Sequence, residues 1–223
     1  MSYPDMPGFS WSTAQVGGLL PDGWAEQLVA VAEKESVFRV LTASSVTSRE
    51  QSPTTEIPSF TVDGNVLRQH APWLTAMYHT TFRDFASRFA GEQVATSGND
   101  LYGAVLNMQR GPMRYECHVD SNPVQGLLYV TTHLPGDGGE LIVARDSDAH
   151  SVEAVEADYD VIYPVSGHLH LFDARRWPHY VRPLRETSAV RVVVAMNFYT
   201  AESPESARPN DLNAHLFGLT DDA

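Results

Sequence analysis

The chain has 223 residues, of which 43% are hydrophobic and 19% charged, so it can bury a sizeable core and we expect a single domain over residues 1–223. Its 15 Lys and Arg against 28 Asp and Glu give a net charge of -13, the opposite of the basic surface that binds nucleic acids or anionic membranes. The single cysteine, Cys117, excludes an internal disulfide. No apolar run is long enough to cross a bilayer and the N-terminus lacks a basic signal-peptide start, so we expect a cytoplasmic protein with neither nucleic-acid nor membrane partners.

Two stretches in the first half of the chain have helical periodicity. From Pro21-Asp22, an N-cap neighbourhood, to about Lys34, apolar residues return every three or four positions. Residues 71–89 carry a broad stripe of large apolar side chains, and both helices should pack against a sheet. Between them, the Ser-, Thr- and Pro-rich residues 42–59 predict a long loop, which serves either as a lid or as a plain surface loop.

Short β-rich runs separated by turn residues follow from Leu101 onwards. Their regular spacing is typical of an antiparallel sandwich or barrel, so we predict a mainly-β protein. The domain would then consist of helical support with the lid loop (1–100), a β core (101–200) and a C-terminal extension on the surface (201–223). The expected strands are residues 101–108, 115–119, 126–132, 140–144, 160–163, 168–173, 180–182 and 190–199.

Three side chains in the β region form a candidate metal site. His118 and Asp120 can converge on one ion, because positions i and i+2 of a strand point to the same face. His179, on a neighbouring strand, can supply a third ligand. Two imidazoles and a carboxylate on one face of an octahedron describe the facial triad of non-haem Fe(II) oxygenases, although zinc hydrolases use the same ligand types.

Arg191 opens the apolar strand Val192–Met196. A buried guanidinium there must find an anion, and a dicarboxylate cosubstrate is one such anion. The alternative is an arginine that extends to solvent or pairs with an acidic side chain.

Several segments carry a family resemblance in order, spacing and strand context. They are Tyr115–Asp120, Gly126–Val130, Gly138–Leu141, Pro164–Phe172, Asp173–Pro183 and Arg191. Over residues 101–199 the chain resembles the prolyl-hydroxylase-like branch of the Fe(II)/2-oxoglutarate-dependent dioxygenases. The resemblance implies a double-stranded β-helix, that is, a jelly-roll or cupin-like barrel, with supporting N-terminal helices.

The resemblance also implies roles for individual residues. His118, Asp120 and His179 would hold Fe(II), and Arg191 would pair with the distal carboxylate of 2-oxoglutarate. Tyr129 falls where the family often places a phenol that hydrogen-bonds to the same carboxylate.

Two further positions depart from the family pattern. Asn197 stands where an aromatic side chain commonly lines the pocket, so it could add a polar contact to the cosubstrate or substrate. Met108 stands where some relatives carry a second tyrosine, which leaves open how many donors hold 2-oxoglutarate.

The implied reaction is the oxidative decarboxylation of 2-oxoglutarate by O2 to succinate and CO2, coupled to hydroxylation of an unactivated C–H bond. Asp120 favours hydroxylation over halogenation, whereas desaturation, ring closure and epoxidation stay open. Since the chain has no separate recognition domain, we expect a small-molecule substrate such as an amino acid or a secondary-metabolite intermediate. The alternatives are a peptidyl or protein prolyl hydroxylase, and a cupin-like metal-dependent isomerase, hydrolase or binding module, which would not need Arg191.

The remaining candidate side chains have structural interpretations. Cys117 should be a small core residue on the opposite strand face from His118, and His168 and His170 should be strand-face residues. Arg110, Arg114 and Arg182 could line the mouth of the pocket.

Overall fold

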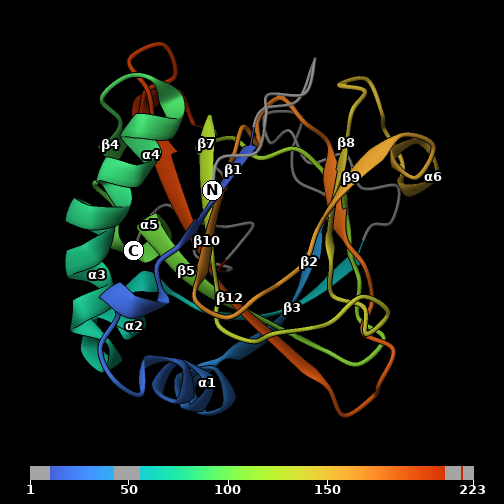
Figure 1. Ribbon diagram of the computed structural model, residues 1–223, viewed down its shortest axis with the longest axis horizontal. Helices are drawn as coiled ribbons and strands as arrows, with labels where there is room; N and C mark the ends of the chain where they lie inside the picture. Colours follow the sequence, from blue (N-terminus) through green and yellow to red (C-terminus); the bar gives the residue numbers. More distant parts are fainter. Residues whose placement is uncertain (1–10, 43–55, 209–216, 218–223) are drawn as a thin grey trace.

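The computed structural model describes residues 11–42, 56–208 and 217, which form two antiparallel β-sheets and a layer of helices. One apolar core lies between the helices and the larger sheet, and a second lies between the two sheets. In Figure 1 helices α1 to α5 lie on the left and below, and strands β8 and β9 of the smaller sheet lie on the right with the short α6.

The larger sheet has eight strands in the order β1-β10-β7-β12-β5-β3-β2, with β4 also paired to β12. At its centre the ten-residue β12 pairs with β7 on one side and β5 on the other, and its Val-rich sequence suits a strand buried on both faces. The strands are β1 (Trp11–Gln15), β2 (Val37–Thr42), β3 (Glu56–Val62), β4 (Ala95–Thr96), β5 (Ala104–Arg110), β7 (Val124–Tyr129), β10 (His168–Phe172) and β12 (Val190–Tyr199).

The smaller sheet has four strands in the order β6-β11-β8-β9. Its apolar side chains, such as Leu141 and Val143, pack against Leu127 and Val193 of the larger sheet. Among the described residues, no hydrogen-bonded ladder joins the two sheets. The strands are β6 (Tyr115–His118), β8 (Leu141–Ala144), β9 (Tyr159–Ile162) and β11 (His179–Val181).

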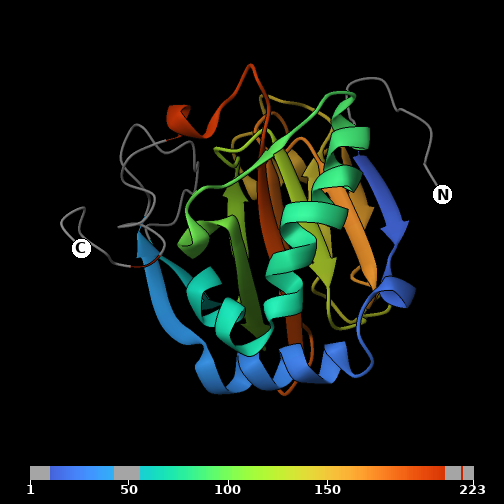
Figure 2. The same cartoon turned by 90° about the vertical axis from the view of Figure 1, so that its left-hand side faces the viewer.

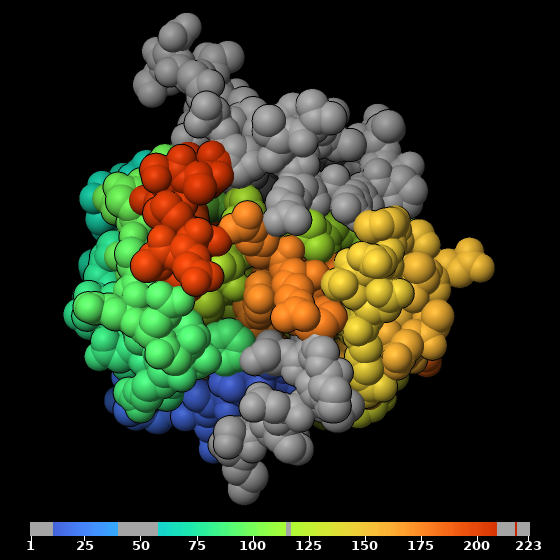
Figure 3. All heavy atoms as spheres, turned by 90° about the horizontal axis from the view of Figure 1, so that it is seen from above, coloured from blue at the N-terminus to red at the C-terminus, as the bar shows by residue number. Residues whose placement is uncertain are grey.

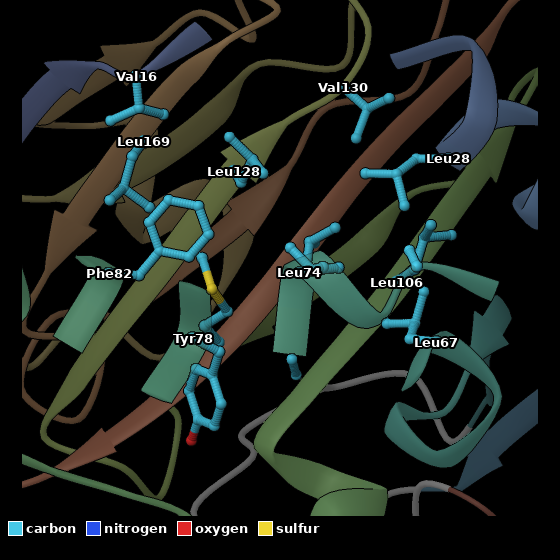
Figure 4. Packing of buried hydrophobic residues seen from close by; sticks show 14 of the residues in the cluster. Val16, Leu28, Leu67, Leu74, Tyr78, Phe82, Leu106, Leu128, Val130 and Leu169 are labelled. Carbon is cyan, nitrogen blue, oxygen red and sulfur yellow. The ribbon is translucent and has the colours of Figure 1, made fainter. Parts of the chain in front are cut away.

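Helices cover the other face of the larger sheet (Figure 2). The longest helical stretch runs through α3, a π-helical segment and α4, and its side chains Leu74, Tyr78 and Phe82 lie over Leu106 and Leu128 of the sheet (Figure 4). The helices are α1 (Trp24–Glu35), α2 (Gly64–His70), α3 (Pro72–Met77), the π-helical segment (Tyr78–Phe82), α4 (Arg83–Ala90), α5 (Asp100–Gly103) and α6 (Val152–Val155), with short 3-10 turns at Gly17–Leu19 and Glu205–Ala207.

The structure confirms a mainly-β protein of antiparallel sheets with supporting helices. All eight strands predicted after residue 100 are present, with ends shifted by a few residues, and both predicted helices are present. The first helix begins at Trp24 with Gly23 as its N-cap, so the predicted N-cap neighbourhood at Pro21-Asp22 is wrong by one or two residues. Within the described ranges, no helix has the length and apolar character needed to cross a membrane.

The first hundred residues contribute more to the sheets than the sequence predicted. Strands β1, β2, β3 and β4 extend the larger sheet, so this region is not helical support alone. The predicted loop at 42–59 is wrong at its end, because β3 begins at Glu56. Residues 43–55, which carry the predicted lid, lie outside the described residues.

The described part of the C-terminal region is tied to the rest of the protein. The Glu205 carboxylate accepts a hydrogen bond of 2.7 Å from the backbone N–H of Gly98 and also pairs with the Ser97 hydroxyl. Figure 3 shows this segment, in red, beside the green atoms of the helical layer. Phe217 is buried against Tyr102 and Val105, so the region is not wholly the surface extension that the sequence predicted.

Candidate active site

The smaller sheet brings His118, Asp120 and His179 together. His118 ends β6 and pairs in register with His179, which begins β11. Asp120 follows β6 by two residues, where its backbone N–H donates to Ala174 O at 2.9 Å. One ligand atom from each of the three side chains lies within 4.8 Å of the others, which is the geometry of a three-ligand metal site.

The carboxylate of Asp120 lies between the two imidazoles. Its Oδ1 is 3.5 Å from His118 Nε2, and its Oδ2 is 3.9 Å from His179 Nε2. Burial is the largest influence and would raise the pKa of Asp120, but its hydrogen bond to His118 and the two imidazoles together outweigh burial and hold the pKa below its ordinary value. Asp120 therefore carries the negative charge that attracts a cation.

The imidazole of His179 is oriented for metal binding. Its Nδ1 lies 2.9 Å from the backbone carbonyl of Trp177, so Nδ1 carries the proton and Nε2 presents a lone pair. Burial is the main cause that lowers the pKa of His179 to about 4, which keeps the ring neutral near pH 7. The Phe172 ring meets the imidazole edge-on at 5.0 Å between centroids and fixes its tilt.

Arg191 is buried at 4% exposure near the beginning of β12. Its side chain passes close to Gly139, where a Cβ atom would lie 3.0 Å from Arg191 Cδ, and the φ of +79° at Gly139 also favours glycine. The guanidinium lies over the Tyr129 ring, at 5.5 Å from Cζ to the ring centroid. Burial lowers the pKa of Arg191 against the opposing effects of Tyr129 and Glu140, yet an arginine stays charged at any physiological pH.

Two polar atoms beside this guanidinium lack a partner. Arg191 Nε and the Tyr129 hydroxyl are both buried and have no hydrogen-bond partner among the described residues. Native proteins rarely leave such groups unsatisfied, so each one needs an explanation. An anion bound against Arg191 and Tyr129 would satisfy both.

A single cavity of about 170 Å³ connects the triad with the arginine. His118, Asp120, His179 and Arg191 all line it, whereas Tyr129 is not among its lining residues and contacts the Arg191 guanidinium instead. The walls between them are mostly apolar and come from both sheets, and they include Leu127, Leu141, Phe172 and Val193. The cavity therefore combines a cation site and an anion site within water-excluding walls.

The remaining predicted positions lie around the same cavity. Asn197 lines it, but its Nδ2 already donates to Tyr102 O at 2.8 Å, so these contacts do not support a role in holding a cosubstrate. Met108 also lines the cavity, and of the three arginines considered for its mouth only Arg114 does. Arg182 instead forms an ion pair with Glu156 at 2.8 Å.

The structure confirms the predicted structural roles of Cys117, His168 and His170. Cys117 is buried in a cluster on the opposite face of the smaller sheet from the cavity. On β10, His168 is half-buried, and His170 is buried with its Nδ1 at 2.8 Å from the Thr13 hydroxyl.

Sequence reasoning missed Gln125, a buried residue of β7 that lines the cavity beside Asp120. The available signal was a lone polar side chain inside the apolar strand Val124–Tyr129, the same signal that singled out Arg191. It also missed Glu140, which is buried and acts electrostatically on Arg191.

No family model and no curated protein sequence matches the chain. Solved structures do match it. The non-heme alpha ketoglutarate dependent carbocyclase SnoK from nogalamycin biosynthesis superposes with a TM-score of 0.62 at 15% identity, over 96% of this chain and 88% of that one. A prolyl hydroxylase from Trichoplax adhaerens, in complex with a hypoxia inducible factor peptide fragment, gives a TM-score of 0.59 at 14% identity, over 87% and 85%.

A third matching structure contains an iron ion and alpha ketoglutarate. The epimerase SnoN in complex with Fe3+, alpha ketoglutarate and nogalamycin RO gives a TM-score of 0.60 at 12% identity, over 87% of this chain and 80% of that one. This chain has the fold of the 2-oxoglutarate- and Fe(II)-dependent oxygenases. Within this oxygenase fold, the His118, Asp120 and His179 side chains form the donor set that suits a divalent iron ion. The unsatisfied Arg191 and Tyr129 atoms suit a carboxylate, so the residues present fit both groups.

Proposed function

We propose that the protein is an Fe(II)- and 2-oxoglutarate-dependent oxygenase that hydroxylates an unactivated C–H bond of a small molecule. The observation that carries this proposal is the single cavity shared by the metal-binding triad and the buried, unsatisfied Arg191. A zinc hydrolase or a simple binding module would need the triad but would have no use for a buried guanidinium at the far end of the same cavity.

His118, Asp120 and His179 would hold Fe(II) through two imidazoles and one carboxylate. When bound, iron and 2-oxoglutarate supply the oxidising chemistry, which consumes O2, releases succinate and CO2 and places one oxygen atom on the substrate.

The chain's own residues bind and orient the 2-oxoglutarate. Arg191 pairs with the distal carboxylate of 2-oxoglutarate, and the Tyr129 hydroxyl donates a hydrogen bond to the same carboxylate, so the keto-acid end points toward the triad. The apolar walls around Leu127 and Val193 exclude water, which strengthens the ion pair with Arg191.

We also propose that the two sheets are the halves of a double-stranded β-helix. The strand orders β10-β7-β12-β5 and β6-β11-β8-β9 support this proposal, because from β5 to β12 successive strands alternate between the two sheets, except for β8 and β9, which pair within the smaller sheet. In such a barrel, β6 and β11 present the triad to the interior.

Two features support a small-molecule substrate. The cavity is lined mostly by apolar side chains, and the solved structures SnoK and SnoN are those of enzymes from nogalamycin biosynthesis. Because the fold also occurs in a prolyl hydroxylase in complex with a peptide, peptides belong in any substrate screen. Hydroxylation is proposed over halogenation because Asp120 occupies the ligand position that a halide would need.

The proposal is tested by measuring succinate formed from 2-oxoglutarate by protein loaded with Fe(II) under anaerobic conditions and then exposed to O2. We expect O2-dependent succinate release that amino acids or small metabolites stimulate. Arg191→Met, which keeps the length of the side chain but removes its charge, should raise the 2-oxoglutarate concentration for half-maximal rate at least about tenfold, the equivalent of about 1.4 kcal/mol.

Circular dichroism and thermal unfolding serve as controls for the folding of the Arg191→Met variant. Succinate formation by Arg191→Met with an unchanged dependence on 2-oxoglutarate would contradict the role of Arg191. A complete absence of succinate from the iron-loaded wild-type protein, with every substrate class including peptides, would contradict the proposed function.

A further inference from the structure

The side chain of Gln125 is buried beside the carboxylate of the metal-binding triad. Gln125 is the second residue of β7 and pairs in register with Asn197 on β12 and with Phe172 on β10. Only 4% of the residue is exposed, and it lines the same cavity as Asp120. The orientation of the Gln125 amide determines whether it donates to this carboxylate.

The surroundings determine that orientation. One end of the amide lies 3.1 Å from Asp120 Oδ2, 2.9 Å from Asn197 Oδ1 and 3.2 Å from Asn122 Oδ1, all of which are acceptors. The other end lies 3.2 Å from the backbone N–H of Met196, which is a donor, and at a longer 3.5 Å from the Gly126 carbonyl. The end near the three acceptors must therefore be the NH2 group, and the carbonyl must face Met196.

One neighbour is a second donor. Asn122 Nδ2 lies 3.0 Å from this end of Gln125 and donates its other hydrogen to Val124 O at 2.9 Å, but this single donor is outweighed by the three acceptors around the same end. An NH2 group has two hydrogens, and the two shortest acceptor distances are those to Asn197 and Asp120. Gln125 thus donates one hydrogen bond to Asp120 Oδ2 and one to Asn197 Oδ1.

Asn197, the second acceptor of the Gln125 amide, is itself held in place by hydrogen bonds. Asn197 Nδ2 donates to Tyr102 O at 2.8 Å, and Asn197 O accepts a hydrogen bond of 2.6 Å from the Tyr78 hydroxyl. Tyr78 belongs to the π-helical segment, and its ring packs on the outer face of the larger sheet. A continuous series of hydrogen bonds therefore joins the helical layer to the carboxylate of the metal site.

We propose that Gln125 is a positioning residue for the metal site, an inference that rests on the proposed function. By occupying Oδ2, the amide leaves Asp120 to bind the ion through Oδ1 alone, in a fixed rotamer. A neutral donor achieves this without adding a positive charge, which would weaken cation binding. Groups that orient metal ligands in this way typically contribute 10- to 100-fold to metal affinity.

The test measures binding of Co(II) to the protein, because the visible spectrum of this ion reports its coordination without any turnover. Gln125→Met removes the amide but keeps the length of the side chain. We expect the Co(II) dissociation constant to rise at least about tenfold and the visible spectrum to change, since Asp120 can then rotate or bind through both oxygens.

The matched control is Gln109→Met, which makes the same substitution at another buried glutamine. The Gln109 amide also lines the cavity, but it donates to the backbone carbonyls of Met113 and Arg182, and among the described residues it makes no hydrogen bond to Asp120. This variant should lose stability but keep the Co(II) affinity within about twofold and keep the wild-type spectrum. If Gln125→Met does not fold, Gln125→Asn, which withdraws the amide by one methylene, should show the same weakening.

His118→Ala separates failure of the inference from failure of the proposed function. It should abolish Co(II) binding, and if it binds Co(II) like the wild-type protein, the metal does not occupy the triad and the proposed function is wrong. If His118→Ala loses Co(II) while a folded Gln125→Met or Gln125→Asn keeps wild-type affinity and spectrum, the positioning role of Gln125 alone is wrong.

Discussion

The hydroxyl of Tyr129 has an unusual position for a buried donor. Among the described residues it has no hydrogen-bond partner, and it lies beside the one buried guanidinium that lines the cavity. A protein gains no stability from such a group, because no hydrogen bond offsets the free-energy cost of desolvating the hydroxyl. The position of this hydroxyl is explained if it forms a hydrogen bond only when an anion binds.

This position predicts opposite effects of Tyr129→Phe on stability and on binding. Removing the unsatisfied hydroxyl should leave the free energy of unfolding of the free protein unchanged or slightly higher. Affinity of the metal-loaded protein for 2-oxoglutarate, measured by calorimetry under anaerobic conditions, should fall about tenfold, because a hydrogen bond to a carboxylate contributes about 1.5 kcal/mol.

Tyr199→Phe is the matched control for this prediction. The Tyr199 hydroxyl is also buried and unsatisfied among the described residues, but its ring belongs to a different cluster, with Tyr102 and Phe217. This variant should resemble Tyr129→Phe in stability and the wild-type protein in 2-oxoglutarate affinity. Equal losses of affinity in both variants would contradict a specific contact from Tyr129.

Strand β10 contains a buried imidazole that bears on acid stability. His170 is fully buried, its Nδ1 pairs with Thr13 of β1, and burial lowers its pKa to about 3. In the unfolded chain the pKa is near its ordinary value of about 6.5. Between these two values the unfolded state binds the extra proton, so stability is lost as the pH falls below about 6.5.

The prediction is a smaller acid sensitivity in His170→Leu. Between pH 7 and pH 5, titration of a histidine that stays neutral when folded removes about 2 kcal/mol from the free energy of unfolding. His170→Leu should lose that part of the pH dependence in urea-unfolding measurements at the two pH values. Thr13→Val, which removes the hydrogen bond but keeps the imidazole, should retain it, and an unchanged pH dependence in His170→Leu would contradict the interpretation.

The elements that the sequence predicted are those with a strong local pattern. The helical stripe of residues 71–89 and the Val-rich β12 bury their apolar side chains in any context, so their periodicity indicates their structure. Strands β2 and β3 escaped prediction because they add to the β5 edge of the larger sheet, and that pairing depends on tertiary contacts. The irregular helical turn at Tyr78–Phe82 likewise has no local signal.

At the scale of the whole molecule, the site was predictable only in part. Residue type and spacing singled out His118, Asp120, His179 and Arg191, which the structure brings to one cavity. The role of Gln125 was not predictable, because its partner Asn197 comes from a distant strand and meets it only in the folded protein. Long-range hydrogen bonds of this kind leave no trace in the local pattern.

The most direct measurement is a crystal structure of the protein with Mn(II) and 2-oxoglutarate, using anomalous scattering to locate the metal. We predict a single strong anomalous peak among His118, Asp120 and His179, and a bound 2-oxoglutarate whose distal carboxylate contacts Arg191 and Tyr129. A metal bound elsewhere, or a 2-oxoglutarate molecule that leaves Arg191 without an anion, would contradict the proposed active site.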